Sequence, residues 1–280
     1  NPYGDIWLKL RPLAYKVHPY QWPTIGKNID HIAGASLEEV EDFFHRFYAP
    51  DNAILSISGN ITDEKALELV KKWFGDIPPV HYTRKALPME PQQTEERRLV
   101  CEHNKVPADA IYKVYHMGDR QSDNFYTCDT ISDILSNGQS SRLYINLIKN
   151  GKLFSEVDAY ITGDMDPGLF IFSGKLSEGV AIEEAEAAIQ NEIDRFIEDP
   201  ISERELQKVI NKTEARISYS EINYQGKSAN LAFFDYLGDV NLINSESTRY
   251  AEVSLDSIKQ TARELFSAKN CSTLWYLKDK

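Results

Sequence analysis

The pattern of apolar and polar residues repeats once along the chain. Residues 36–58 align without a gap with residues 254–276, an offset of 218 positions. Both copies read as an amphipathic helix, a short polar turn and a strand. In the first copy, Ser36 and Glu39 form a capping box, which satisfies free N–H groups at a helix start. Because order and register persist throughout, we favour duplicated domains over a chance likeness of two helix–strand units.

Helical spacing of apolar residues predicts several further helices. They cover residues 36–48, 63–74, 122–136, 140–150 and 180–197. Ser202 and Glu205 form a second capping box and start another long helix. Leu8, Leu10 and Leu13 indicate part of a helix near the N-terminus. The chain is therefore rich in amphipathic helices.

Alternating or continuous apolar runs predict the strands. They cover residues 53–58, 98–103, 108–117, 156–162 and 169–176. Residues 163–168 should join the last two strands as a hairpin, and proline makes residues 18–23 an extended loop. Paired strands that alternate with helix pairs predict an α+β fold: an antiparallel sheet with helices packed on one face.

A proline-rich stretch predicts the domain boundary. Residues 76–93 carry four prolines and little apolar periodicity. We therefore predict that 1–80 are the C-terminal remnant of a first domain, 81–96 a linker and 97–280 a complete second domain. The first copy of the repeat has little sequence before it, so we expect the first domain to lack its N-terminal side.

Composition excludes several classes of protein. A net charge of −12 argues against a nucleic-acid partner, because phosphate contacts need a basic surface. No apolar run approaches the roughly 20 residues that a membrane span needs. The three cysteines are isolated, and the nucleotide-binding and serine-hydrolase signatures are missing. These features predict a soluble protein without a membrane span.

Five stretches, in this order along the chain, resemble the M16 family of zinc metallopeptidases. They are HPYQWPTIG at 18–26, FYAPDNAILSISGNIT at 47–62, KKWFGDIP at 71–78, SSRLYINLI at 140–148 and EREL at 203–206. The resemblance implies two similar α+β domains of a little over 200 residues in each half-molecule, which agrees with the offset of the repeat.

The resemblance places catalysis outside this sequence. The family binds zinc through a His-x-x-Glu-His helix and a downstream Glu, and the Glu inside the motif activates the metal-bound water. That motif is absent here, because no two of the six histidines lie four residues apart. We therefore assign no catalytic residue and no metal ligand. We expect zinc in the full-length parent, none bound by this chain, and no hydrolysis by this chain alone.

The stretch SSRLY at 140–144, one of those that resemble the family, supplies the candidate substrate-binding residues: Ser140, Ser141 and Arg142. Free N–H groups at this helix start could bind a carboxylate or peptide carbonyl, or Ser140 could simply cap the helix. Arg142 binds substrate or makes an intramolecular ion pair. The family often has an Arg and a Tyr further on that contact substrate; here those positions hold Ile148 and Ser155.

The resemblance implies the C-terminal, non-catalytic portion of a bacterial M16 zinc metallopeptidase. It would help to form the chamber in which an unfolded or extended peptide is hydrolysed. Its partner would be the N-terminal M16 catalytic domain or a partner M16 subunit. The alternative is a non-catalytic M16-like partner or scaffold subunit. We expect a location in the bacterial cytoplasm or periplasm. A truncated first domain would expose apolar surface, so we predict that the chain self-associates or docks its remnant against the second domain.

Overall fold

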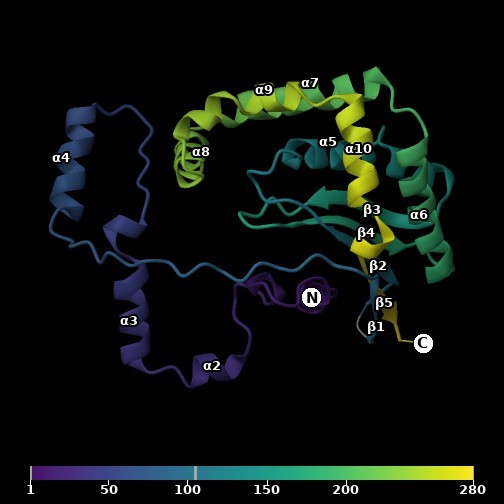
Figure 1. Ribbon diagram of the computed structural model, residues 1–280, viewed down its shortest axis with the longest axis horizontal. Helices are drawn as coiled ribbons and strands as arrows, with labels where there is room; N and C mark the ends of the chain where they lie inside the picture. The colour runs from purple at the N-terminus through teal and green to yellow at the C-terminus, as the bar shows by residue number, and fades with distance from the viewer. Residues whose placement is uncertain (1, 104–105, 280) are drawn as a thin grey trace. The chain divides into compact units, whose positions relative to one another are not determined.

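The chain forms two compact units in the computed structural model, which describes residues 2–103 and 106–279 (Figure 1). Unit 1 contains the described residues of Asn1–Pro23, Leu87–Lys212 and Arg249–Lys280. Unit 2 contains Thr24–Ala86 and Thr213–Thr248. The units are defined by contacts within the chain, and the division into domains 1–80 and 97–280 stays a prediction.

Unit 1 is built around one five-stranded sheet with the strand order β1-β5-β2-β4-β3. The strands are β1 (Arg97–His103), β2 (Ala110–His116), β3 (Phe154–Ile161), β4 (Leu169–Leu176) and β5 (Cys271–Lys278). Strand β1 runs parallel to β5, and the other neighbours are antiparallel. The predicted α+β class and the β3–β4 hairpin are confirmed.

The predicted layer of helices covers one face of this sheet. It consists of α5 (Phe125–Ser136), α6 (Ile182–Glu198) and α10 (Leu255–Leu265) (Figure 1). Side chains alternate across a strand, so the odd-numbered residues of β2 share this face. The ring of Tyr115 lies 5.2 Å from that of Phe266, which follows α10, and Phe170 on β4 lies 5.1 Å from the same ring. These buried aromatic rings form the centre of the helix-covered core.

A further helix, α1 (Ile6–Ala14), covers part of the opposite face. The sequence indicated this helix but not its position. Its apolar residues Ile6, Leu10 and Ala14 belong to one buried cluster with Val114 and Leu274 of the sheet. The central strands are therefore buried on both faces. This explains why their apolar runs are nearly continuous.

Two other segments of unit 1 differ in detail from their predictions. The helix expected at 140–150 ends in a π-helix, η3 (Tyr144–Asn150). The prediction of an extended loop at 18–23 is wrong at η1 (Pro19–Gln21), where the chain forms a 3-10 turn. The Nδ1 atom of His18 accepts the N–H of Tyr20 at 3.2 Å, and a proline fits the first position of a helical turn. A local cap thus outweighs the extended preference.

Unit 2 consists mainly of helices. They are α2 (Ile29–Ala33), α3 (Leu37–Phe47), η2 (Pro50–Asn52), α4 (Asp63–Phe74), α8 (Tyr224–Tyr236) and η4 (Val240–Asn244). In sequence, α7 (Glu203–Ser220) and α9 (Glu246–Ala251) run across the boundaries between the units. The capping box of Ser36 and Glu39 is confirmed, with N–H to oxygen distances of 2.8 and 3.2 Å. None of the described helices is long and apolar enough to cross a bilayer.

The predicted strand at 53–58 is wrong. No other segment of the described chain pairs with it. Its counterpart in the repeat is β5, which has β1 on one side and β2 on the other. A strand forms only where a neighbour satisfies its backbone groups. The sequence pattern is therefore that of a strand, but the described part of unit 2 supplies no sheet for it.

Two leucines of α1 test how this helix packs. Leu10 is fully buried, whereas Leu8 is 50% exposed on the same helix. We expect Leu10→Ala to lower the free energy of unfolding by about 2–5 kcal/mol, because it leaves a cavity in the core. Leu8→Ala should change it by no more than about 0.5 kcal/mol. Chemical denaturation measures both; equal effects would show that α1 does not pack on the sheet.

Candidate functional site

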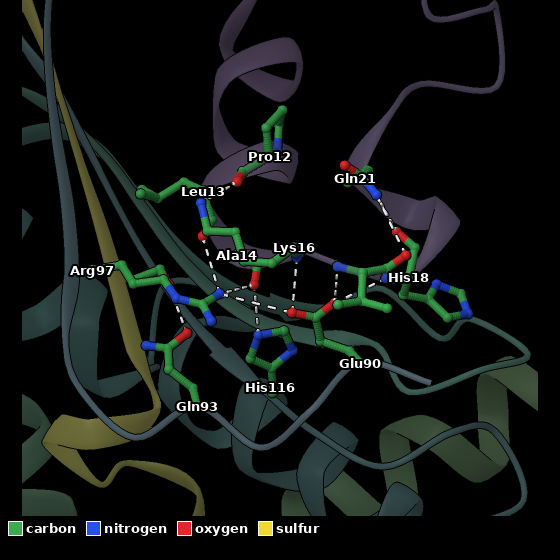
Figure 2. A network of polar contacts seen from close by, with 12 residues as sticks. Pro12, Leu13, Ala14, Lys16, His18, Gln21, Glu90, Gln93, Arg97 and His116 are labelled. Carbon is green, nitrogen blue, oxygen red and sulfur yellow. Dashed lines mark hydrogen bonds and ion pairs between the residues drawn. The ribbon is translucent and has the colours of Figure 1, made fainter. Parts of the chain in front are cut away.

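One carboxylate holds the chain where it leaves α1 (Figure 2). The side chain of Glu90 accepts the backbone N–H groups of Lys16, Val17 and His18 at 2.8, 2.7 and 2.9 Å. Partial burial raises the pKa of Glu90, but these three hydrogen bonds outweigh burial and lower the pKa overall. Glu90 therefore stays ionised and fixes the path of residues 16–18.

Two further side chains hold the C-terminal end of α1 (Figure 2). The Arg97 guanidinium donates to the carbonyls of Leu13 and Ala14, and His116 Nε2 donates to the Ala14 carbonyl at 2.9 Å. These carbonyls belong to the last turn of the helix, where carbonyl groups have no hydrogen-bond donor within the helix. Burial lowers the pKa of His116, although its bond to Ala14 opposes this. Strands β1 and β2 thus both anchor the helix.

The same N-terminal segment holds the loop between β3 and β4. Tyr15 donates its hydroxyl to the Pro167 carbonyl at 3.1 Å, and the Asp166 N–H reaches the Tyr20 hydroxyl at 3.3 Å. The buried His18 places Nε2 at 3.5 Å from a carboxylate oxygen of Asp166. The position of the β3–β4 hairpin therefore depends on residues 15–20.

Beside α1, the sheet face contains a recess of about 250 Å³. Four aromatic rings and four polar side chains line it: Tyr3, Trp7, Tyr112, Tyr160, Glu156, Asp158, Ser173 and Lys175. The even-numbered residues of β3 supply three of these side chains, because they share the face that α1 only partly covers. The recess is thus an open, polar part of an otherwise apolar sheet.

The charges in the recess are unequal. Glu156 and Lys175 form an ion pair at 2.6 Å, and the Lys175 ammonium lies 5.5 Å from the centre of the Tyr3 ring. The carboxylate of Asp158 has no hydrogen bond or ion pair with the described residues, although its backbone pairs with β4. Burial and the neighbouring Glu156 charge raise the pKa of Asp158, and Lys175 opposes this. One ammonium therefore faces two carboxylates.

Strand β3 forms an edge of the sheet, because among the described residues it pairs only with β4. The Thr162 N–H bonds the Leu169 carbonyl at 2.9 Å. In an antiparallel ladder such bonded pairs alternate with unbonded ones. The N–H and C=O groups of Val157, Ala159 and Ile161 therefore point away from β4. Ser136 donates to the Ala159 carbonyl at 2.7 Å. No strand of the described chain pairs with the remaining outward groups.

The predicted substrate-binding residues lie directly before η3. Arg142 makes a two-point ion pair with Glu205 at 2.9 and 3.2 Å. Ser140 accepts a hydrogen bond from Lys208 at 3.1 Å. The buried hydroxyl of Ser141 has no hydrogen-bond partner in the described part of the chain. Arg142 thus makes the intramolecular ion pair that was one of its two predicted roles. A substrate-binding role for these three residues stays a prediction.

The residues of the recess were missed by the sequence analysis. Glu156, Asp158 and Tyr160 alternate with apolar residues, a signal that one face of this strand is polar. The signal does not reveal that β3 is an edge strand, because strand order depends on distant segments. Ser155, at the position where the family often has a Tyr, donates to the Lys175 carbonyl at 3.2 Å.

The side chains present do not fit the zinc site of a peptidase. In the ranges 2–103 and 106–279, no group of three histidine, cysteine, aspartate or glutamate side chains is placed to hold a metal. His116 uses Nε2 on the Ala14 carbonyl, and His18 uses Nδ1 on the Tyr20 N–H. One ring nitrogen of each histidine is thus engaged in hydrogen bonds within or to the N-terminal segment.

Unit 1 is an α+β domain in which β3 has no strand neighbour other than β4 among the described residues. The model of the family described as "Peptidase M16 inactive domain" matches residues 34–213, and the chain belongs to this family. Residues 34–213 therefore correspond to the inactive, non-catalytic domain of this family.

Two curated relatives carry related names. The chain is 25% identical to "Zinc protease PqqE" of Helicobacter pylori over 98% of its own length, and 21% identical to "Uncharacterized zinc protease YmxG" of Bacillus subtilis over 92%. It spans 62% of the length of each relative.

Two solved structures share the fold. A protease from Helicobacter pylori has a TM-score of 0.90 and 22% identity, over 99% of this chain and 67% of that one. A peptidase M16 inactive domain from Pseudomonas fluorescens has a TM-score of 0.85 and 15% identity, over 100% of this chain and 66% of that one. Both likenesses extend over nearly the whole chain.

The Arg142–Glu205 ion pair makes stability depend on pH. Partial burial raises the pKa of Glu205, but hydrogen bonds from Arg142 and Ser202 outweigh this and lower the pKa from 4.5 to about 2. The ionised carboxylate therefore stabilises the fold above pH 4.5, and this contribution is lost as the pH falls toward 2. We expect Glu205→Gln to be less stable than wild type at neutral pH, with the difference shrinking below pH 4.5.

Denaturation at a series of pH values measures this difference. Glu203→Gln, in the same first turn of α7, is the control and should leave stability near the wild-type value. A difference between wild type and Glu205→Gln that is constant with pH would contradict the ion pair.

Proposed function

We propose that this chain is the C-terminal, non-catalytic portion of an M16 zinc metallopeptidase and binds an extended stretch of unfolded peptide along β3. The outward backbone groups of Val157, Ala159 and Ile161, apart from the Ala159 carbonyl that Ser136 binds, carry this proposal, since no strand of the described chain pairs with them. An added strand gains affinity from main-chain hydrogen bonds, which do not depend on sequence. Such binding suits an enzyme that accepts unfolded peptides.

The second edge of the sheet, β1, is less suited to a peptide. Its residue Arg98 is bound by Glu186 at 2.9 Å and by Glu96 at 2.7 Å. Charges that are already paired offer less to a ligand. Beside β3, in contrast, the recess contains a carboxylate without a partner in the described chain. The unpaired backbone and the unpaired charge thus lie on the same edge strand.

The chemistry would belong to the rest of the enzyme. We propose that the parent is a zinc metalloendopeptidase whose N-terminal M16 domain holds the metal and activates water. The names of both relatives, which are zinc proteases, support this. This chain would form part of the chamber wall and hold the peptide while the other domain cleaves it. The bacterial cytoplasm or periplasm is the proposed location.

An uncovered helix face supports the proposed partner. On α3, Val40, Phe43 and Phe44 are 55%, 56% and 55% exposed. The repeat aligns them with residues of α10 that are buried in unit 1, Ile258, Thr261 and Ala262. The same amphipathic face is therefore covered in one copy and open in the other. We propose that the catalytic M16 domain, in the same chain or in a partner subunit, covers this face.

Peptides methylated on alternate backbone nitrogens test strand addition. Only every second residue of an added strand bonds the edge. Methyl groups on the nitrogens that face β3 should therefore weaken binding of a labelled unfolded peptide to the purified chain by roughly tenfold or more, since several hydrogen bonds are lost. A peptide methylated on the other alternate set of nitrogens should bind like the unmethylated peptide. Fluorescence anisotropy measures both affinities; equal losses for the two methylated peptides would refute strand addition.

A further inference from the structure

We propose that the recess beside β3 binds one basic side chain of the docked peptide, with Asp158 as its counter-ion and Tyr112 and Tyr160 as its walls. The proposal rests on peptide docking along β3 and adds a preference to it. Main-chain hydrogen bonds alone would accept any sequence. The recess would make the site favour peptides that carry a lysine or an arginine at one position.

Strand geometry brings such a side chain to the recess. A strand added to β3 places alternate side chains on the face of Glu156, Asp158 and Tyr160. Side chains directly opposite each other across two strands lie about 5 Å apart at their Cβ atoms. The peptide side chain opposite Asp158 therefore reaches the middle of this row. Its long aliphatic part would lie against the aromatic lining.

The charges define the chemistry of the ligand. Lys175 already neutralises Glu156 at 2.6 Å, whereas Asp158 has no ion pair in the described chain. A carboxylate that is half-buried has lost part of its hydration and gains more from a cation than an exposed one does. The recess lacks one positive charge. It therefore fits a single basic side chain rather than two.

The lining adds a second reason to favour a cation. Tyr3, Tyr112 and Tyr160 line the same recess as the Asp158 carboxylate, and the Lys175 ammonium already lies 5.5 Å from the Tyr3 ring. Aromatic faces attract ammonium and guanidinium groups, more strongly where water is partly excluded. Ile6 and Trp7 of α1 also line the recess. An acidic side chain would meet two carboxylates here and be repelled.

Four labelled peptides that differ only at the central residue test the preference. With arginine or lysine at the centre, we expect binding to the purified chain to be on the order of tenfold tighter than with alanine. Glutamate at the centre should bind more weakly than alanine. Fluorescence anisotropy gives the four dissociation constants in one buffer.

Three variants locate the preference. Asp158→Asn should bind all four peptides about as tightly as wild type binds the alanine peptide. Glu178→Gln, which removes an exposed acid outside the recess, should keep the wild-type order. Asp158→Lys should reverse the order and favour the glutamate peptide. Normal binding of the alanine peptide by Asp158→Asn shows that the variant is folded.

The outcomes separate this inference from the proposed function. Equal affinities for the four peptides on the wild-type chain, or an unchanged order in Asp158→Asn, would overturn the basic-side-chain site while leaving docking on β3 intact. A wild-type chain that binds none of the four peptides would overturn both.

Discussion

The arrangement of unit 1 depends on one carboxylate that binds three successive backbone N–H groups. Glu90 comes from the stretch before β1, and the groups it binds belong to Lys16, Val17 and His18. Hydrogen bonds to an ionised group are roughly twice as strong as those between neutral groups. This contact fixes where the chain goes after α1. It thereby also fixes the segment that supports the β3–β4 loop.

The anchor decides which part of the sheet stays open. Arg97 and His116 hold the end of α1 near β1 and β2, so this helix buries the second face of the central strands only. The face beside β3 remains uncovered and contains the recess around Asp158. The polar surface is open because α1 covers only part of the sheet, and it adjoins a free edge because β3 is the last strand in the order. We propose this combination as the basis of peptide binding by the domain.

Local signals in the sequence were sufficient for many elements. The cap and spacing of Ser36 and Glu39 predicted α3, and the apolar runs around 163–168 predicted the hairpin. Longer-range features were not predictable. The strand pattern at 53–58 lacks a neighbour in the described chain, and the position of α1 depends on contacts with residues far along the sequence. The role of Asp158 follows from strand order, which local patterns do not contain.

Hydrogen exchange at the backbone of β3 tests the central claim most directly. The amides of Val157, Ala159 and Ile161 face away from β4, so they should exchange faster than the amides bonded to β4 in the free chain and more slowly when an unfolded peptide is bound. The amides of Asp158 and Tyr160, which already face β4, should change little. Protection confined to the outward set would support strand addition at β3. Protection of another region, with these three amides unchanged, would contradict it.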